Sequence, residues 1–380
     1  MRAFLKAGVF LLLLIAPFTS HAQEADDTNS QVSQVYLEKA QVASTTSLGS
    51  QTEPWSGTQM QNQLVEVKVL EGPDKGKNAT FSNNYTQVKV GDLVYVRHEF
   101  GGFDLETWAL MDAYRLNVLA GVAIGFLVLL LLIGGPQGLR GLASLIGSLV
   151  LIFYVLLPGL SSGYSPILVS IGVSSLIIIV GSYITHGFNR TTTIAMASMI
   201  ITVAVVGIAT YFVIHAAQLS GFTTEENAYL NLGVKGSIDM VGLLFGGIMI
   251  GLLGVLYDIA IGQAIAVEEL VAAAAHYTRK QIFGRAMRIG REHIGALVNT
   301  LAIAYVGAAL PLLLLFKQTS DTSIFYILNS ERFATEIIRI LMGSSGLVLA
   351  VPITTFLAVY VLYGRKPRVG SGSETHHHHA

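Results

Sequence analysis

The chain has 380 residues, of which 52% are hydrophobic and 12% charged, with a formal net charge of −1 and a mean hydropathy of +0.59. Soluble domains carry about 25% charged residues, so this composition predicts an integral membrane protein in contact with the lipid bilayer, and the charge gives no basis for nucleic-acid binding. The sequence has no cysteine, which excludes disulfides, thiolate metal sites and a cysteine nucleophile.

Residues 1–22 have the pattern of a secretory signal peptide. Arg2 and Lys6 precede an apolar run that ends at Ala16, and small residues follow as far as Ala22. We expect cleavage after Ala22, with an uncleaved anchor helix as the alternative. In both cases the next part of the chain lies outside the cytoplasm.

A small extracytoplasmic antiparallel β domain is predicted at 64–99. Val65, Val67 and Val69 alternate with polar residues, as expected of a half-buried strand. A turn over 71–77 leads to a strand near 79–81, and 88–96 has the pattern of strand, Gly-Asp turn and strand.

The segments on either side of this β domain are predicted to be irregular. Residues 23–63 are polar and indicate a flexible lead-in with one strand near 35–42, and 100–115 indicates a linker. The domain could be a binding module with Tyr85 and Tyr95 as contacts. We favour a folded cap or assembly spacer, because no metal cluster or catalytic set is evident there.

The remainder is predicted to be a seven-span helical bundle over 116–363, followed by a cytoplasmic tail at 364–380. A helix needs about 20 residues to cross a bilayer. The apolar segments of that length are 116–134, 139–158, 165–185, 192–216, 238–261, 294–316 and 337–363.

The distribution of Lys and Arg predicts the orientation. If the β domain is exported, the cytoplasmic side holds ten basic residues: Arg140, Arg190, Arg279, Lys280, Arg285, Arg288, Arg291, Arg365, Lys366 and Arg368. The other side after the first span holds four: Lys235, Lys317, Arg332 and Arg339. Because retained loops are enriched in Lys and Arg, we predict an inner-membrane protein with its N-terminus outside and its C-terminus in the cytoplasm.

Asp258 is the first candidate for function, because it interrupts an apolar run from Met240 to Val267 and a charge within a span is costly unless paired or hydrated. At about 1.5 Å per residue it lies roughly 27 Å from Met240, toward the cytoplasmic end. It could relay protons or bind a cation. It could also pair with the nearby Arg285, Arg288 or Arg291.

Glu292 and Asn299 are seven residues apart and share one face of the next span. Together with Asp258 they could form an ion or proton pathway. Asn299 could instead serve as a hydrogen bond between helices, since an unpaired amide in lipid is costly.

A polar cluster is predicted at the cytoplasmic ends of the helices, formed by His186, Asn189, Arg190, Arg291 and His293. The two histidines could handle protons near neutral pH or cap helix carbonyls. The run from His376 to His379 could bind metal adventitiously, and no function, resident metal or cofactor is assigned to it.

Two further patterns concern the shape of the helices. Gly242 with Gly246, and Gly247 with Gly251, are spaced for close helix contact in lipid. In the last span, Gly343, Gly346 and Pro352 predict a helix break, which could line a cavity or be a plain kink.

Several separated motifs resemble the YibE/F family of bacterial membrane proteins. They are GLLGVLYDIAIGQAIAVEEL at 251–270, GREHIGALVNTLAIAYVGAALPLLLL at 290–315, GSSGLVLAVPIT at 343–354, HGFNRT at 186–191 and DAYR at 112–115. The resemblance covers roughly 64–363 and implies a multi-spanning protein with a small extracytoplasmic β domain.

The family motifs include Asp258, Arg291, His293 and Asn299. Glu292 stands where an Asp is common, and Tyr257 where some members carry a second acid. The membrane part is also similar to half of the RND-type domain of the SecD and SecF export subunits, which we treat as analogy.

Two functions remain open from the sequence. One is a transporter or export component coupled to protons or cations through Asp258. The other is a non-catalytic accessory protein whose β domain docks an extracytoplasmic partner, with a homo-oligomer also possible in principle. An embedded enzyme is disfavoured, because the sequence has no HExxH and no Ser within G-x-S-x-G.

Overall fold

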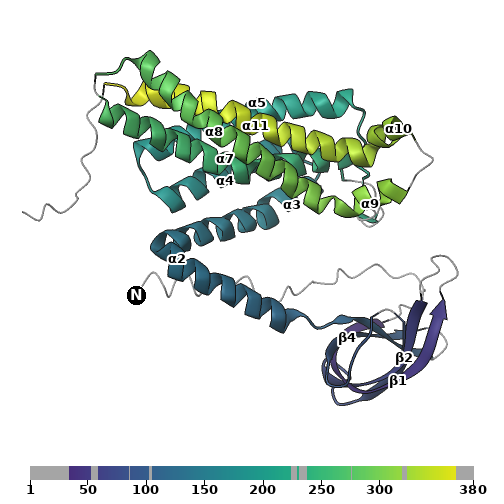
Figure 1. The fold of residues 1–380 in the computed structure, drawn as a ribbon. Coiled ribbons are helices and arrows are strands. Elements are labelled where there is room, and N and C mark those ends of the chain that lie inside the picture. Colours follow the sequence, from purple (N-terminus) through teal and green to yellow (C-terminus); the bar gives the residue numbers. More distant parts are fainter. Residues whose placement is uncertain are drawn as a thin grey trace, which may run out of the picture. The chain divides into compact units, whose positions relative to one another are not determined.

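The computed structural model describes residues 34–52, 59–84, 86–101, 105–223, 229–230, 238–274, 276–318 and 323–364 (Figure 1). The predicted signal peptide, Tyr85 and the tail from residue 365 lie outside the described residues. The chain divides into two compact units, Met1–Ile133 and Gly134–Ala380, and each is described by itself.

The first unit is built on a five-stranded antiparallel sheet in the order β3-β2-β1-β4-β5. The strands are β1 (Gln34–Thr52), β2 (Gln59–Glu71), β3 (Asn78–Asn83), β4 (Leu93–Gly101) and β5 (Leu105–Ala113). The long central strand β1 pairs with both β2 and β4, and register shifts interrupt its pairing with β2 at three points. Such bulges bend a strand, and the sheet curls into a half-barrel.

The inward face of this sheet forms a core of its own. Val65 and Val67 are fully buried and pack with Ala40, Val42 and Phe81. The alternation that predicts an antiparallel β domain is therefore confirmed, because Val65, Val67 and Val69 are buried and the residues between them are not.

The boundaries predicted for the β domain need three corrections. Residues 23–63, predicted as a flexible lead-in with one strand near 35–42, do contain that strand, but it is longer than predicted, β1 (Gln34–Thr52), and the start of β2 follows it. The predicted linker at 100–115 contains β5. Residues 88–90 are not a strand, since β4 begins only at Leu93. The second half of β1 is rich in Ser and Thr and has no residue in the apolar core, and it is held in the sheet by its pairing with β2.

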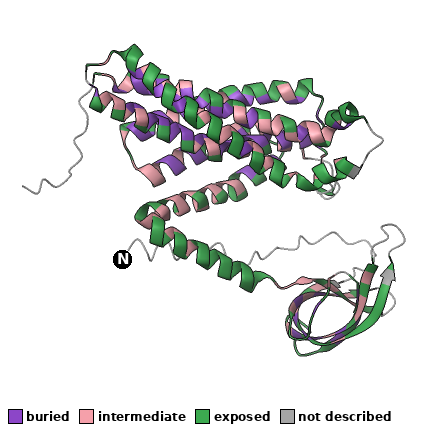
Figure 2. Cartoon of the chain, in the orientation of Figure 1, coloured by how far each residue is buried: buried purple, intermediate pink, exposed green. Residues whose placement is uncertain are grey.

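The second unit is helical. Its elements are the latter part of α2 (Leu116–Leu151), the π-helical turn η1 (Ile152–Leu156), α3 (Leu157–Ser161), α4 (Pro166–His186), α5 (Arg190–Ala216), α7 (Met240–Ala273), α8 (Arg279–Ala308), α9 (Leu310–Gln318), α10 (Ile324–Asn329) and α11 (Glu331–Leu362). Helices α4, α5, α7, α8 and α11 pack against one another, with α7 and α11 in most of the contacts. Figure 2 shows buried residues, coloured purple, along α4, α5, α7 and α11.

Five of the helices in the described residues are long and apolar enough to cross a membrane, or six if the bent pair of α8 and α9 is one span. The first of the five, Leu116–Ser161, has 46 residues, about 69 Å at 1.5 Å per residue, more than twice the ~30 Å hydrocarbon core. Gly135 has a non-helical conformation inside α2, and Pro136 follows it. These helices support a membrane-embedded helical unit, as the composition predicts.

Candidate functional site in the helical bundle

A buried amide joins three helices of the bundle. The side chain of Gln263 on α7 is only 1% exposed, and its Nε2 donates to the carbonyl oxygen of Ala286 on α8 at 2.9 Å and to Thr355 Oγ1 on α11 at 2.7 Å. Gly290 on α8 leaves the space that the Gln263 amide oxygen occupies. This amide therefore fixes α7, α8 and α11 together where lipid offers no competing partner.

Hydroxyl groups make a second buried connection. Thr354 Oγ1 on α11 donates to Ser198 Oγ on α5 at 2.9 Å, and both residues are fully buried. Ser198 also donates to carbonyls of its own helix at Ile194 and Ala195. The buried interior of the bundle is therefore mainly apolar, with polar contacts between helices at Gln263 and at the Ser198–Thr354 pair.

The predicted polar cluster is divided between a helix corner and an exposed face. Asn189 caps α5 by accepting from Thr192 N at 2.7 Å, and its Nδ2 donates to the carbonyl oxygen of His186 at 3.0 Å. Asn189 therefore closes the corner between α4 and α5. Arg190 is exposed beside it, and Arg291 and His293 are exposed on α8.

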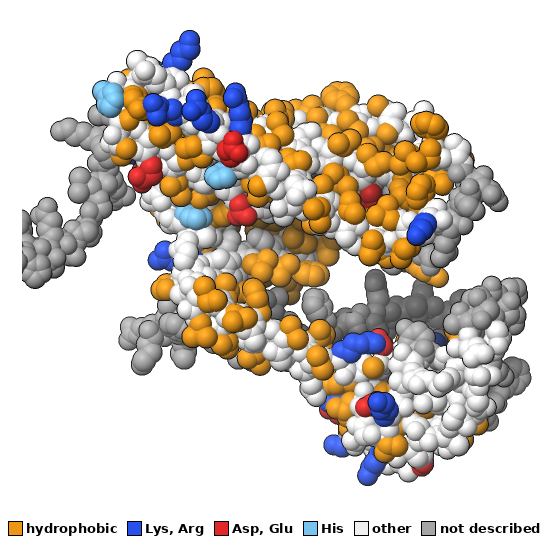
Figure 3. Space-filling model, in the orientation of Figure 1, with side chains coloured by type: hydrophobic (Ala, Val, Ile, Leu, Met, Phe, Trp, Pro, Cys, Tyr) orange, Lys and Arg blue, Asp and Glu red, His pale blue; other side chains and the backbone are white. Residues whose placement is uncertain are grey.

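The same end of the bundle is held by a hydrogen bond and an apolar cluster. Thr191 Oγ1 on α5 donates to Glu268 Oε2 on α7 at 2.6 Å. Ile194, Val267, Ile282, Ala286, Ala358, Val359 and Leu362 pack together there. Figure 3 shows Lys and Arg side chains gathered at one end of the helical unit, and they include the basic first half of α8.

Asp258 lies on an exposed face of α7, between the exposed Gly254 and Gly262. Among the described residues it makes no ion pair, so the pairing proposed with Arg285, Arg288 or Arg291 is not formed. Its electrostatic neighbour is His186, whose ring packs at 5.8 Å from that of Tyr257. Tyr257 in turn donates to the carbonyl oxygen of Gly181 at 2.8 Å.

Glu292 and Asn299 are also exposed, on α8. Within the described part of the chain, no hydrogen bond or ion pair joins Asp258, Glu292 and Asn299 to one another. The pathway through these three residues remains a prediction, and it would run along an outer face of the helices rather than through the buried centre.

Three of the four glycines predicted to mark helix contacts have a neighbour close by. A Cβ on Gly242 would overlap Pro166 of α4, and a Cβ on Gly251 would overlap the hydroxyl of Tyr305 on α8. Gly246 would bring its Cβ to 2.9 Å from Ser170 Oγ on α4, whereas Gly247 faces open space.

The predicted break in the last span is absent. Helix α11 continues from Glu331 to Leu362 through Gly343, Gly346 and Pro352. Gly346 packs directly on Leu252 of α7 and Gly343 on Leu301 of α8. The glycines admit neighbouring side chains, and Pro352 costs one backbone hydrogen bond without ending the helix.

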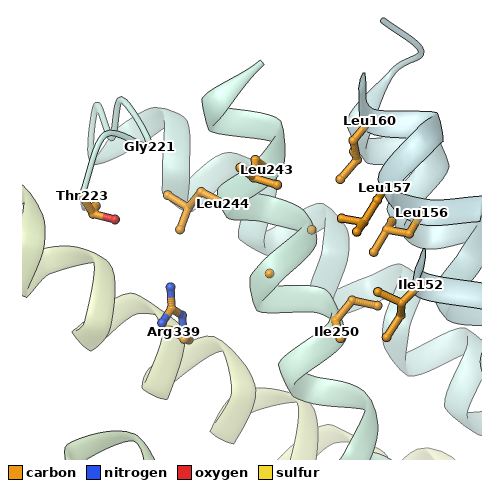
Figure 4. Close-up of a pocket in the computed structure, with 12 residues that line it drawn as sticks. Ile152, Leu156, Leu157, Leu160, Gly221, Thr223, Leu243, Leu244, Ile250 and Arg339 are labelled. Carbon is orange, nitrogen blue, oxygen red and sulfur yellow. The ribbon is translucent and has the colours of Figure 1, made fainter. Parts of the chain in front are cut away.

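A cavity of about 390 Å³ lies at the other end of the bundle (Figure 4). Its walls are apolar side chains of η1, α3 and α7, among them Ile152, Leu157 and Leu244, and Arg339 of α11 projects toward it. The Arg339 guanidinium forms an ion pair with Glu336 at 2.9 Å. The partner of this positive charge therefore lies on the same helix, α11.

Residues 122–364 match the family described as YibE/F-like protein. The chain belongs to this YibE/F-like family. The match covers more than half of the chain and lies in the helices. The five-stranded sheet, which ends at Ala113, lies outside the matched residues. No curated protein and no solved structure matches the chain.

The sequence analysis did not identify Gln263, Ser198 or Thr354 as connecting residues. A glutamine within the apolar run of α7 is a signal that could have been used, because an amide there must find partners. Ser198 and Thr354 carry no such signal, since a serine or threonine in a span can bond to its own helix.

Proposed function

We propose that this YibE/F-like protein is a membrane transport or export component in which Asp258 exchanges a proton or binds a cation. The observation that carries the proposal is a carboxylate within an apolar membrane helix that has no ion-pair partner among the described residues. A structural acid would be expected to be paired. His186 beside it is a side chain suited to proton exchange near neutral pH.

The proposal predicts that Asp258→Asn abolishes proton movement. Purified protein would be reconstituted in vesicles that enclose a pH-sensitive dye, and an imposed pH gradient would be followed with time. We expect the proton flux above that of empty vesicles to fall at least about tenfold in Asp258→Asn, which corresponds to a barrier higher by ~1.4 kcal/mol or more, because an amide cannot carry the proton.

Glu269→Gln is the matched control, since Glu269 is an exposed acid on the same helix, eleven residues further on. A hydrophobic carbodiimide, which attacks protonated carboxyl groups in membranes, should modify Asp258 and block the flux. Equal flux in Asp258→Asn and the unmodified protein, together with no modification of Asp258, would eliminate the relay.

The proposal includes seven crossings, an exported β sheet and a cytoplasmic connection between α7 and α8. It takes the 46-residue first segment as two spans separated at Gly135 and α8 with α9 as one bent span. The gathering of basic side chains at one end of the bundle supports this orientation (Figure 3).

Because the chain has no cysteine, single cysteines can test the topology. In spheroplasts, a membrane-impermeant maleimide should label Ser50→Cys in β1 without lysis, and should label Lys280→Cys in α8 only after lysis. Both residues are exposed. Labelling of both sites in intact spheroplasts would contradict the proposed orientation.

An accessory role for the β domain is the second candidate. The sheet has its own core, and it exposes Val35 and Leu37 of β1 at 45% and 63%. Val35 and Leu37 lie two residues apart and so on one face of β1, and adjoining exposed apolar side chains are a common contact for a partner. Crosslinking from Leu37→Cys in the full chain should capture an extracytoplasmic protein if this role is correct, and crosslinking from Ser50→Cys should not.

A further inference from the structure

Three side chains that are far apart in the sequence meet inside the β sheet. Glu38 lies on β1, His98 on β4, and Asp74 in the turn between β2 and β3. Glu38 and His98 are 1% exposed and Asp74 is 8% exposed. One nitrogen or oxygen atom from each lies within 4.8 Å of the other two. The expectation that this domain lacks a cluster of side chains able to hold a metal ion is therefore wrong.

The chain is shaped around the Glu38 carboxylate. Gly72 has a φ of +115° and a Cβ there would overlap the Glu38 side chain, so the turn requires glycine at this position. Glu38 Oε1 accepts a hydrogen bond from Asp74 N at 2.9 Å. The carboxylate and the turn that carries Asp74 are thereby held in contact.

The imidazole of His98 is held just as firmly. Its ring stacks on Trp108 of β5 with centroids 4.0 Å apart and an interplanar angle of 5°, and its edge meets Phe100. Nδ1 lies 2.5 Å from Asp74 Oδ2, and Nε2 lies 3.0 Å from Glu106 Oε1 without the geometry of a hydrogen bond. The ring cannot easily turn away from the acids.

The cluster holds two carboxyl groups, and one of their buried oxygen atoms lacks a hydrogen-bond partner among the described residues. Glu38 Oε2 is buried with no hydrogen-bond partner among the described residues, a costly state for a carboxylate oxygen. The hydrogen bond from Lys77, helped by His98, holds the pKa of Asp74 below its usual range despite burial.

We propose that Glu38, Asp74 and His98 form a binding site for a divalent transition-metal ion, with Zn²⁺ as the best-suited species. One imidazole nitrogen and two carboxylate oxygens form a donor set that Zn²⁺ accepts at about 2.0–2.2 Å, with a position left for water. The ion would take the place of the direct contact between Asp74 Oδ2 and His98 Nδ1 and give the unpaired Glu38 oxygen a partner.

Binding requires only local movement. The Lys77 ammonium, 2.5 Å from Asp74 Oδ1, would leave, and its side chain is 58% exposed. Asp74 Oδ2 and His98 Nδ1 would separate to about 3.3 Å, the spacing of two ligands on a tetrahedral ion with ~2 Å bonds. The alternative is a metal-free network in which Asp74 keeps its contacts with Lys77 and His98.

Trp108 supplies a direct readout, because paramagnetic Co²⁺ bound beside the stacked imidazole would quench its fluorescence. The full-length protein would carry Trp55→Phe, which leaves Trp108 as the single tryptophan of the two in the sequence. It would also carry alanine at 376–379 in place of the histidines. In this background we expect saturable quenching by Co²⁺, reversed by Zn²⁺, and one Zn²⁺ per chain after dialysis.

The variants separate a site from general surface binding. Glu38→Gln keeps the acceptor for Asp74 N and should abolish the saturable quenching, as should His98→Gln. Glu66→Gln, which alters an acid of β2 bonded to Ser44, should leave it intact. Lys77→Met should strengthen Co²⁺ binding at least about fivefold, since it removes a competing positive charge.

Lys77→Met is expected to bind Co²⁺ more tightly, and a misfolded variant would not show such an increase. Absence of saturable quenching in the parent background would overturn the site, as would Glu38→Gln binding Co²⁺ as tightly as Glu66→Gln. Retained metal with no proton flux in vesicles would reject the transport proposal alone, so the two proposals fail separately.

Discussion

Gly290→Val is expected to destabilise the helical bundle by about 1–3 kcal/mol, the usual cost of overpacking a core. A Cβ at Gly290 would overlap Val351 of α11 and lie 2.9 Å from Gln263 Oε1. The added side chain would push α8 away from α11 and disturb the bonds that Gln263 makes. Loss of folded protein on heating in detergent, followed by size-exclusion chromatography, measures the change.

Gly295→Val is the matched control on the same helix. A Cβ at Gly295 meets nothing within 4 Å, so the substitution should leave the apparent Tm near that of the parent protein. Both substitutions raise helix propensity in the same way, and the difference between them therefore isolates packing. Equal melting of the two variants would contradict the close contact at Gly290.

Glu331→Ala is expected to have an effect of similar size at the other end of the bundle. The Glu331 carboxylate accepts from Ser220 N at 2.7 Å, Gly221 N at 2.9 Å and Ser220 Oγ at 2.8 Å. It fastens the segment after α5 to the first turn of α11. Hydrogen bonds to a charged group are worth about 1.5–3 kcal/mol, and partial exposure favours the lower half of that range.

Arg332→Ala serves as the control for Glu331→Ala, because Arg332 is the next residue and is exposed. Thermal unfolding and protease cleavage after α5 would both be measured. We expect faster cleavage and a lower apparent Tm in Glu331→Ala alone. Cleavage at the parent rate in Glu331→Ala would show that the carboxylate does not fasten this segment.

The sequence predicted the class of fold because hydrophobicity is a local property. An apolar run long enough to cross a bilayer identifies itself, and Val65, Val67 and Val69 identify the inner face of β2 without knowledge of its partners. The strand β1 was missed over most of its length, since Ser, Thr and Gln predominate in its second half. This second half is held by its pairing with β2, which is not a property of the segment itself.

The same contrast applies to the candidate sites. Asp258 could be identified as a candidate from the sequence alone, because an ionisable side chain within an apolar helix is unusual whatever the helix packs against. Whether Asp258 pairs with the nearby arginines depended on the packing of α7 and α8. The glycines of α11 predicted a break, but Leu252 and Leu301 fill the space beside them and the helix continues.

By itself, the sequence determined that this protein has a membrane-embedded helical part and a small antiparallel β domain, because both follow from the spacing of apolar residues along the chain. Only the tertiary structure decided which polar groups meet. Glu38, Asp74 and His98 come together through strand register and a glycine turn, and Gln263 reaches Thr355 through helix packing. Such contacts depend on how segments that are distant in the sequence pack together, and the spacing of residues within one segment does not determine that packing.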